Sequence, residues 1–336
     1  MKAGSEGDRP FMFLPNREGE ILAGRYRVER ELGKGGMGVV IRARHIHLDE
    51  PVAIKLLLPE LVHDPDIVER FMREARAAAK IKNLHVVRVT DVDRLESGMP
   101  YMVMEYLEGM DLADLLKHRT TLEVREAIDY VLQACDAMID AHAHGICHRD
   151  LKPANMFLTR ARDGSALVKI LDFGISKRIV EGERELTQTA ASLGTPSYMS
   201  PEQFISSRSV DGRSDIWALG CILYKLLTGS GPFRGDLVNP VGHAVLYAAA
   251  APPSALRPEL APALDAIILR CLEKLPEKRY QTVIALAEAL DAYLLEAEAD
   301  LPPAVEPRPT SGRRSPAPSD RGARPVSEQS EPRPVS

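Results

Sequence analysis

Several features that mark particular classes of protein are missing from this sequence of 336 residues. Its four cysteines, Cys135, Cys147, Cys221 and Cys271, include no Cys-x-x-Cys pair and no short spacing of a disulfide framework. We therefore expect free thiols and a reducing, cytoplasmic location. The first twenty residues mix acidic and basic side chains without an apolar run, which excludes a secretory signal.

Long apolar runs and an excess of basic charge are also missing. The longest uncharged stretch, residues 237–256, includes three prolines, so we expect no membrane span. Lys and Arg total 43 against 48 Asp and Glu, a net charge of −5, and this balance gives no indication of a nucleic-acid partner. With 45% hydrophobic and 27% charged residues, the composition is typical of a globular protein.

The chain divides into three regions. Residues 301–336 hold nine of the 25 prolines and no aromatic residue, so they cannot form a core. We predict a leader over residues 1–25, a folded unit over 26–295 and a disordered tail over 296–336 that is rich in Pro, Arg and Ser. No internal repeat is present.

The folded unit changes character near residue 108. Up to residue 106, short apolar runs with β-branched residues at 39–41, 52–54 and 86–89 predict a small sheet, interrupted by one helix over 66–80. Beyond residue 110, helical spacing predicts a long helix to Gly145, with Thr120 and Glu123 as a capping box. Further helices are predicted over 214–228, 261–272 and 282–295, whereas residues 172–202 show no sustained period.

Three glycines, Gly33, Gly35 and Gly38, satisfy the pattern Gly-x-Gly-x-x-Gly. In a dinucleotide-binding unit this pattern opens a helix, but here β-branched residues follow, and a strand-loop-strand flap over phosphates fits better. The strand-like segment 52–55 ends at Lys55, and Glu74, 19 residues later, is a candidate counter-charge.

The strongest signal is the run His148-Arg149-Asp150-Leu151-Lys152-Pro153-Ala154-Asn155, followed 22 residues after Asp150 by Asp172-Phe173-Gly174. Chance gives five such polar identities in roughly one chain in 10⁴ of this length. The sequence resembles the eukaryotic-type (Hanks-type) protein kinase family, in its bacterial serine/threonine branch. The resemblance implies an α+β, two-lobed fold, in which a small antiparallel sheet with one long helix (26–107) precedes a larger, mainly α-helical lobe (108–295).

The resemblance also implies an activity and its residues. Asp150 accepts the proton of the substrate hydroxyl, and Lys152 places positive charge near the transferred phosphoryl group. Asn155 and Asp172 ligate Mg²⁺, with Mn²⁺ as an alternative ion, and the phosphate donor is ATP. The substrates are expected to be Ser/Thr hydroxyls of proteins.

Further positions follow from the same match. Those expected at the nucleotide are Leu32, Gly33, Lys34, Gly35, Gly36, Met37, Gly38, Val39, Val40, Ala53, Lys55, Glu74, Met104, Glu105 and Leu107. Glu202 is expected to pair with Arg279, Asp215 to hold the catalytic-loop backbone, and Thr195 to lie in the substrate-binding turn.

Regulation is expected in the segment that follows Asp172. Arg149, directly before Asp150, is typical of kinases whose loop is ordered by phosphate, and Thr187 and Thr189 are the expected acceptors. A homodimer is compatible with phosphorylation in trans. Many relatives continue into a membrane span and an external sensor, whereas this chain ends with its tail, which favours a soluble kinase.

Alternatives remain open at this point. A pseudokinase scaffold is disfavoured because Lys55, Asp150, Asn155 and Asp172 are all present, and a small-molecule phosphotransferase is disfavoured by the segment 194–202. The chain also departs from its relatives, since Leu84-His85-Val86-Val87 stands where a His-Pro-Asn turn is usual. His142, His144 and His148 with Cys147 are a weaker metal-ligand hypothesis.

Overall fold

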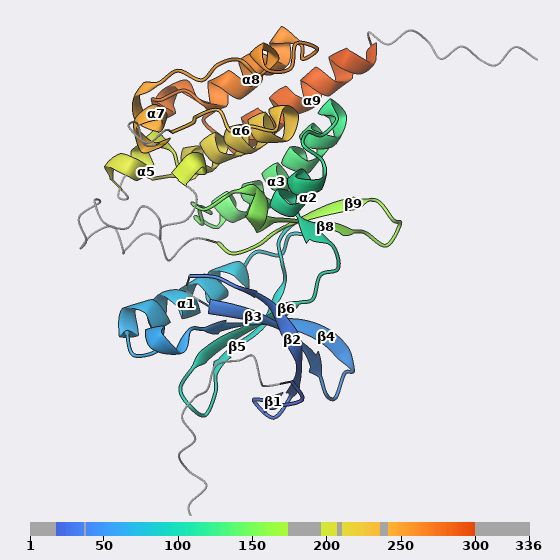
Figure 1. Ribbon diagram of the computed structural model, residues 1–336, viewed down its shortest axis with the longest axis vertical. Coiled ribbons are helices and arrows are strands. Elements are labelled where there is room, and N and C mark those ends of the chain that lie inside the picture. Colours follow the sequence, from blue (N-terminus) through green and yellow to red (C-terminus); the bar gives the residue numbers. More distant parts are fainter. Residues whose placement is uncertain (1–17, 37, 174–195, 207–209, 236–240, 300–336) are drawn as a thin grey trace, which may run out of the picture.

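The computed structural model describes residues 18–36, 38–173, 196–206, 210–235 and 241–299, which form two lobes (Figure 1). The smaller lobe is built on an antiparallel sheet with the strand order β1-β2-β3-β4-β6-β5. Its strands are β1 (Ile21–Leu22), β2 (Tyr26–Lys34), β3 (Gly38–His45), β4 (Glu50–Leu57), β5 (Val89–Arg94) and β6 (Pro100–Glu105).

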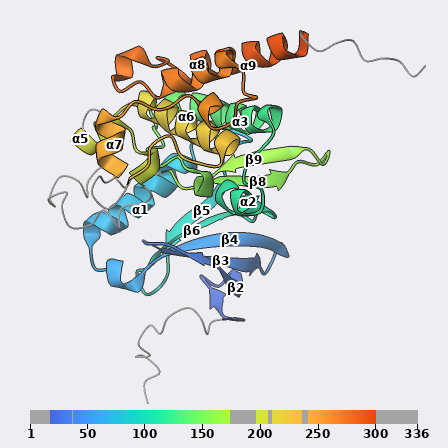
Figure 2. The same cartoon turned by 45° about the horizontal axis from the view of Figure 1, so that its top comes forward.

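One long helix, α1 (Pro65–Ala78), packs against β5 and β6 of this sheet (Figure 2). The side chain of Asp64 caps it, accepting hydrogen bonds from the backbone N–H groups of Asp66 and Ile67. Helical spacing places Val68, Phe71 and Ala75 in the core between the helix and the sheet. Glu74 lies on the same buried face, so this packing decides where its carboxylate points.

The larger lobe is mainly helical and is held by one core cluster around α3 and α6. Its α-helices are α2 (Leu112–His118), α3 (Val124–Ala143), α5 (Pro201–Ile205), α6 (Gly212–Thr228), α7 (Val241–Tyr247), α8 (Pro262–Cys271) and α9 (Val283–Ala299). A small sheet, β7 (Met110–Asp111), β8 (Met156–Arg160) and β9 (Ala166–Ile170), lies on the side of α3 that faces the smaller lobe (Figure 1). Short 3₁₀ turns complete the lobes: η2 (Pro59–Leu61), η3 (Pro153–Asn155), η4 (Pro196–Tyr198), η6 (Pro253–Ala255) and η7 (Pro276–Lys278).

The α+β, two-lobed fold predicted from the sequence is confirmed, and the predicted helices agree with the structure within a few residues. Gly145 ends the long helix as expected, because its φ of 70° lies in the left-handed region that glycine adopts without strain. None of the helices in the described ranges combines the length and the apolar composition that crossing a bilayer requires.

Two local predictions are wrong. The capping box at Thr120 and Glu123 does not form: Glu123 is the N-cap of α3 and its side chain makes no capping hydrogen bond. The preceding residue, Leu122, is buried and donates its backbone N–H to Leu226 O, so packing against α6 decides this turn. The strand predicted over 86–89 begins only at Val89, and Val86 forms an isolated parallel bridge with Ile170.

Candidate active site

The glycine-rich segment joins β2 to β3 as a strand-loop-strand flap, not as the start of a helix. Gly35 donates its backbone N–H to Gly38 O at 2.8 Å, which tightens the turn. A Cβ at Gly38 would lie 2.4 Å from Leu56 O on β4, so only glycine fits there. Gly36 lies in the described part of this flap, and Met37 lies outside the described residues.

A pocket of about 380 Å³ lies beneath this flap, between the lobes. The predicted nucleotide residues that line it are Leu32, Gly33, Val40, Ala53, Met104, Glu105 and Leu107, together with Asp172. Val39 differs, because alternation along β3 turns its side chain into the core on the opposite face of the sheet, while Val40 faces the pocket. Lys34 ends β2 at the entrance of the flap.

Other residues that line the pocket were missed by the sequence reasoning: Arg30, Val87, Tyr106, Gly109, Asp111, Phe157 and Leu171. Phe157 and Leu171 come from the larger lobe and reach the pocket because β8 and the segment after β9 lie under it. The apolar run after Asn155 signals a strand, but strand periodicity alone does not tell which face meets a ligand.

Lys55, on β4, joins the two lobes electrostatically. Its ammonium Nζ lies 2.7 Å from Asp172 Oδ1 and 3.5 Å from Glu74 Oε1. Burial lowers the pKa of Lys55, but the charges of Asp172 and Glu74 outweigh burial and the net pKa is raised. The structure therefore holds this lysine charged between two carboxylates.

Asp150, Lys152 and Asn155 converge on the loop between α3 and β8. Lys152 Nζ lies 3.0 Å from Asp150 Oδ2, and the Asn155 side-chain amide donates to Asp150 O at 2.8 Å. Leu171 N donates to Asn155 O at 2.9 Å, which fixes the segment carrying Asp172 against this loop. Asn155 and Asp172 thus lie on two segments that this backbone bond holds together, and their side-chain oxygen atoms are hard donors of the kind that suits Mg²⁺.

Two residues of this region have a backbone conformation that is costly without glycine. Arg149 has φ 64° and Asp172 has φ 46°, both in the left-handed region. Such a conformation costs on the order of 1–3 kcal/mol and persists only where surrounding contacts enforce it. At Arg149 these contacts come from a buried residue of α6.

Asp215, buried in the first turn of α6, makes those contacts. Its Oδ1 accepts from Arg149 N at 2.8 Å and its Oδ2 accepts from His148 N at 2.9 Å. Oδ2 also lies 2.7 Å from His142 Nε2. Burial raises the pKa of Asp215. The hydrogen bond and charge of His142, with smaller contributions from His148 and Arg149, lower it by more, so the net pKa lies below its ordinary value and the carboxylate stays ionised.

Glu202 and Arg279 form a bidentate pair in the core of the larger lobe. Arg279 Nη1 and Nη2 lie 2.8 and 2.7 Å from the two Glu202 oxygens, and Ser214 Oγ donates to Glu202 Oε1 at 2.6 Å. The remaining guanidinium N–H groups donate to backbone carbonyls, including that of Arg213. Removing one member of such a pair costs about 3–5 kcal/mol, because the other charge is left buried.

The turn after α1, which departs from the pattern of relatives, is held by its own side chains. Asn83 accepts from His85 N at 2.8 Å and donates to Asp136 Oδ2 on α3 at 2.9 Å. His85 Nδ1 lies 3.0 Å from Val168 O on β9. Different residues therefore bind this turn to the larger lobe and still seat α1 with Glu74 beside Lys55.

A second contact missed by the sequence reasoning lies behind the pocket. Lys169 on β9 is buried and its Nζ lies 2.7 Å from Glu105 Oε1, which also accepts from Arg88 N at 2.8 Å. This contact links β9, the end of β6 and the segment before β5. A lone lysine in a strand usually indicates a solvated surface, so no signal in the sequence pointed to it.

Three predicted residues, Thr187, Thr189 and Thr195, lie outside the described residues. The described part of the neighbouring segment begins with η4 and α5. There Gln203 Nε2 donates to Arg149 O at 2.9 Å, which connects this segment to the loop that carries Asp150.

Comparisons with known proteins agree with this geometry. The family model for the protein kinase domain matches residues 26–290. The chain is 37% identical over 317 residues to serine/threonine-protein kinase PknB of Mycolicibacterium smegmatis, covering 94% of this chain and 50% of that protein. It is 41% identical over 276 residues to serine/threonine-protein kinase Pkn1 of Myxococcus xanthus, covering 82% of this chain and 39% of that protein. The chain thus spans half or less of the length of these curated relatives.

A solved structure with the same fold is the PknI kinase domain of Mycobacterium tuberculosis. The match has a TM-score of 0.63 and 30% sequence identity, and it covers 82% of this chain and 98% of that domain. The fold match therefore extends over both lobes and over the pocket between them.

Proposed function

The chain belongs to the protein kinase family, and on that premise we propose that it is an ATP-dependent serine/threonine protein kinase. The observation that carries this proposal is the position of Lys55, within 2.7 Å of Asp172 Oδ1 and 3.5 Å of Glu74 Oε1. A charged lysine beside the pocket under the glycine flap is suited to hold nucleotide phosphates.

The reaction is transfer of the ATP γ-phosphoryl group to a protein hydroxyl. The hydroxyl oxygen forms a bond to the γ-phosphorus while the bond from that phosphorus to the bridging oxygen of ADP breaks. The Asp150 carboxylate orients the hydroxyl and takes its proton. Lys152, whose Nζ lies 3.0 Å from Asp150 Oδ2, is placed to compensate negative charge on the group in transit.

Asn155 and Asp172 would hold the metal ion. The Asn155 amide nitrogen is engaged by Asp150 O and Oδ2, which leaves its carbonyl oxygen as a ligand. An amide oxygen and a carboxylate are the donors that Mg²⁺ prefers, and Mn²⁺ accepts the same set. An ion held by these two residues would supply positive charge to the phosphate oxygens.

Two alternatives belong to other classes of protein. A pseudokinase scaffold needs the fold but not the charged set, and the set of Lys55, Asp150, Asn155 and Asp172 argues against it. A small-molecule phosphotransferase does not need a peptide-binding segment next to its base, and the bond from Gln203 to Arg149 O supports such a segment here.

Measuring phosphate transfer from ATP to protein acceptors and to small-molecule acceptors distinguishes these functions. Purified chain with labelled ATP and Mg²⁺ is expected to label a general protein acceptor on Ser and Thr, and not sugars or aminoglycosides. Asp150→Asn is expected to lower turnover about 10²- to 10⁴-fold by removing the base. The exposed Asp163→Asn is the matched control and should retain full turnover. Equal turnover in the two variants would refute the assignment of Asp150.

Regulation is part of the proposal. Thr187 and Thr189 are proposed autophosphorylation sites, with a second copy of the chain as the enzyme, and Arg149 is proposed to pair with the phosphate. Mass spectrometry after incubation with ATP tests this directly, and active protein without phosphate on either threonine would exclude them. The free cysteines, Cys135, Cys147, Cys221 and Cys271, support a reducing compartment such as the cytoplasm.

A further inference from the structure

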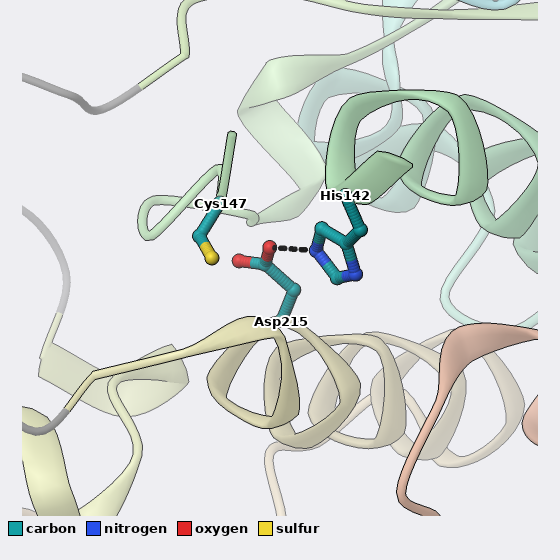
Figure 3. A group of neighbouring side chains, drawn as sticks. All are labelled: His142, Cys147 and Asp215. Atoms are coloured by element: carbon teal, nitrogen blue, oxygen red, sulfur yellow. Dashed lines mark hydrogen bonds and ion pairs between the residues drawn. The ribbon is translucent and has the colours of Figure 1, made fainter. Parts of the chain in front are cut away.

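His142, Cys147 and Asp215 form a cluster beneath the catalytic loop, on the side away from the nucleotide pocket. One nitrogen, one sulfur and one oxygen atom of these residues all lie within 4.8 Å of one another. Figure 3 shows the three side chains pointing toward a common centre from α3, from the loop after it and from the start of α6. Residues from three segments thus meet although only two of them are close in sequence.

We propose that this cluster is an inhibitory zinc site. Imidazole nitrogen, thiolate sulfur and carboxylate oxygen are the donors that Zn²⁺ takes, and three protein ligands leave a fourth position for water. Zn–ligand distances of about 2.0–2.3 Å require the three atoms to lie roughly 3.3–3.6 Å apart. His142 Nε2 and Asp215 Oδ2 lie 2.7 Å apart, so an ion must break their hydrogen bond and move these two atoms apart, with Cys147 Sγ as the third donor within 4.8 Å. A hard cation such as Mg²⁺ prefers oxygen ligands and does not favour a thiolate sulfur.

The site is open to an ion from outside. His142 and Cys147 line a hollow of about 570 Å³ between α3, the start of α6 and the start of α9. The His142 side chain is 21% exposed, whereas Asp215 is 1% exposed and is not among the residues that line the hollow, so an entering ion meets His142 and Cys147 first. A Cβ at Gly212 would lie 2.7 Å from the His142 ring, so glycine at this position lets the imidazole lie against α6.

The other histidines near the loop cannot join the cluster. The His148 ring is fully buried, with Nδ1 accepting from Asp150 N and Nε2 lying 2.9 Å from Leu171 O. His144 Nδ1 bonds to Asp140 O at 2.8 Å on the exposed side of the helix end. The ligand set therefore differs from the one that sequence proximity indicated, and Asp215 is its new member.

Zinc at this position acts on the catalytic loop through Asp215. The same carboxylate accepts from His148 N and Arg149 N, which hold the backbone just before Asp150. A zinc ion replaces the His142 hydrogen bond and draws electron density from the Asp215 oxygens, so the carboxylate becomes a weaker acceptor for the two backbone N–H groups. Inhibition of phosphate transfer follows, and this part of the inference rests on the proposed function.

Binding is tested first, on the full chain freed of metal by a chelator and without ATP. Zn²⁺ is titrated against a chromophoric chelator, and Co²⁺ is used as a spectroscopic probe for a sulfur-to-metal absorption band. Wild type is expected to bind one ion with that band. Cys147→Ser should lose the band and weaken Zn²⁺ binding by more than about 10-fold. His144→Asn is the matched control and should bind like wild type.

Inhibition is tested separately, with Mg²⁺–ATP in large excess. Zn²⁺ is expected to inhibit wild type and His144→Asn, while Cys147→Ser keeps its activity at the same Zn²⁺ concentration. Cys147→Ser binding Zn²⁺ as tightly as wild type, or no Co²⁺ band in wild type, would overturn the site. Absence of any phosphate transfer in zinc-free wild type would instead contradict the proposed function, because the binding measurement does not depend on activity.

Discussion

At Lys55 two opposing effects act on one ammonium group. Burial disfavours its charge, while Asp172 and Glu74, within 2.7 and 3.5 Å, favour it and prevail. The lysine is thus already charged and oriented before any nucleotide arrives. Preorganised charge of this kind lowers a reaction barrier without reorganisation cost.

Lys55→Met is therefore expected to cost about 3–4 kcal/mol of transition-state stabilisation, measured as a fall in kcat/KM for ATP. The fall should exceed about 100-fold. The exposed Lys80→Met, in the turn just after α1, removes the same charge from the smaller lobe and should leave kcat/KM unchanged. Similar values for the two variants would show that Lys55 carries no special role.

At the scale of elements, the turn after α1 decides how the smaller lobe is attached. Asn83 reaches α3 through Asp136, His85 reaches β9 through Val168 O, and Val87 N donates to Ile170 O at 3.0 Å. These hydrogen bonds fix the position of α1 relative to the larger lobe. The position of Glu74 relative to Lys55 depends on that attachment.

Asn83→Ala is expected to lower the free energy of unfolding by about 1–3 kcal/mol, since it removes the side-chain hydrogen bonds of Asn83 to Asp136 and to His85 N. Because the loss loosens α1, KM for ATP should also rise. Urea denaturation and ATP-dependent kinetics check both effects. The neighbouring exposed Lys82→Ala should change stability by no more than about 0.5 kcal/mol. If Asn83→Ala behaves like Lys82→Ala, the turn is held by other contacts.

For the whole molecule, three buried groups, His148, Glu202 and Asp215, make stability depend on pH in the same direction. Burial lowers the pKa of His148 below 6.5. Burial raises the pKa of Glu202 and Asp215, but their partners outweigh it and the net values lie below 4.5 and 3.8. In each case the folded chain binds fewer protons than the unfolded chain as pH falls through these values. The stability that these three groups contribute is therefore fully present above pH 6.5 and is lost toward acid.

The free energy of unfolding is expected to decline gently below pH 6.5 and more steeply below pH 4.5. Urea denaturation at each pH, followed by the fluorescence of the single, buried Trp217, measures this decline. Glu202→Gln should flatten the steep part, whereas the exposed Glu259→Gln should not. An unchanged steep part in Glu202→Gln would mean that other carboxylates dominate acid unfolding.

The sequence by itself determined the class of fold of this protein and predicted the residues that we propose to be chemically active. Apolar residues that recur every two or every 3.6 positions, and motifs such as His148 to Asn155, involve only a few neighbouring positions. They can therefore be recognised without knowing the fold. The turn at Thr120 shows the limit of such reading, because a contact with α6 overrode its local signal.

The tertiary structure decided how distant residues meet, although the family resemblance already implied that Asp215 holds the catalytic-loop backbone and that Glu202 pairs with Arg279. Lys55 and Asp172 are 117 positions apart, and Asp215 gathers His142, His148 and Arg149 from at least 66 positions away. Lys169 meets Glu105 behind the pocket in the same way. These contacts depend on how helices and strands pack and in which register, and packing is a property of the whole chain that no local pattern encodes.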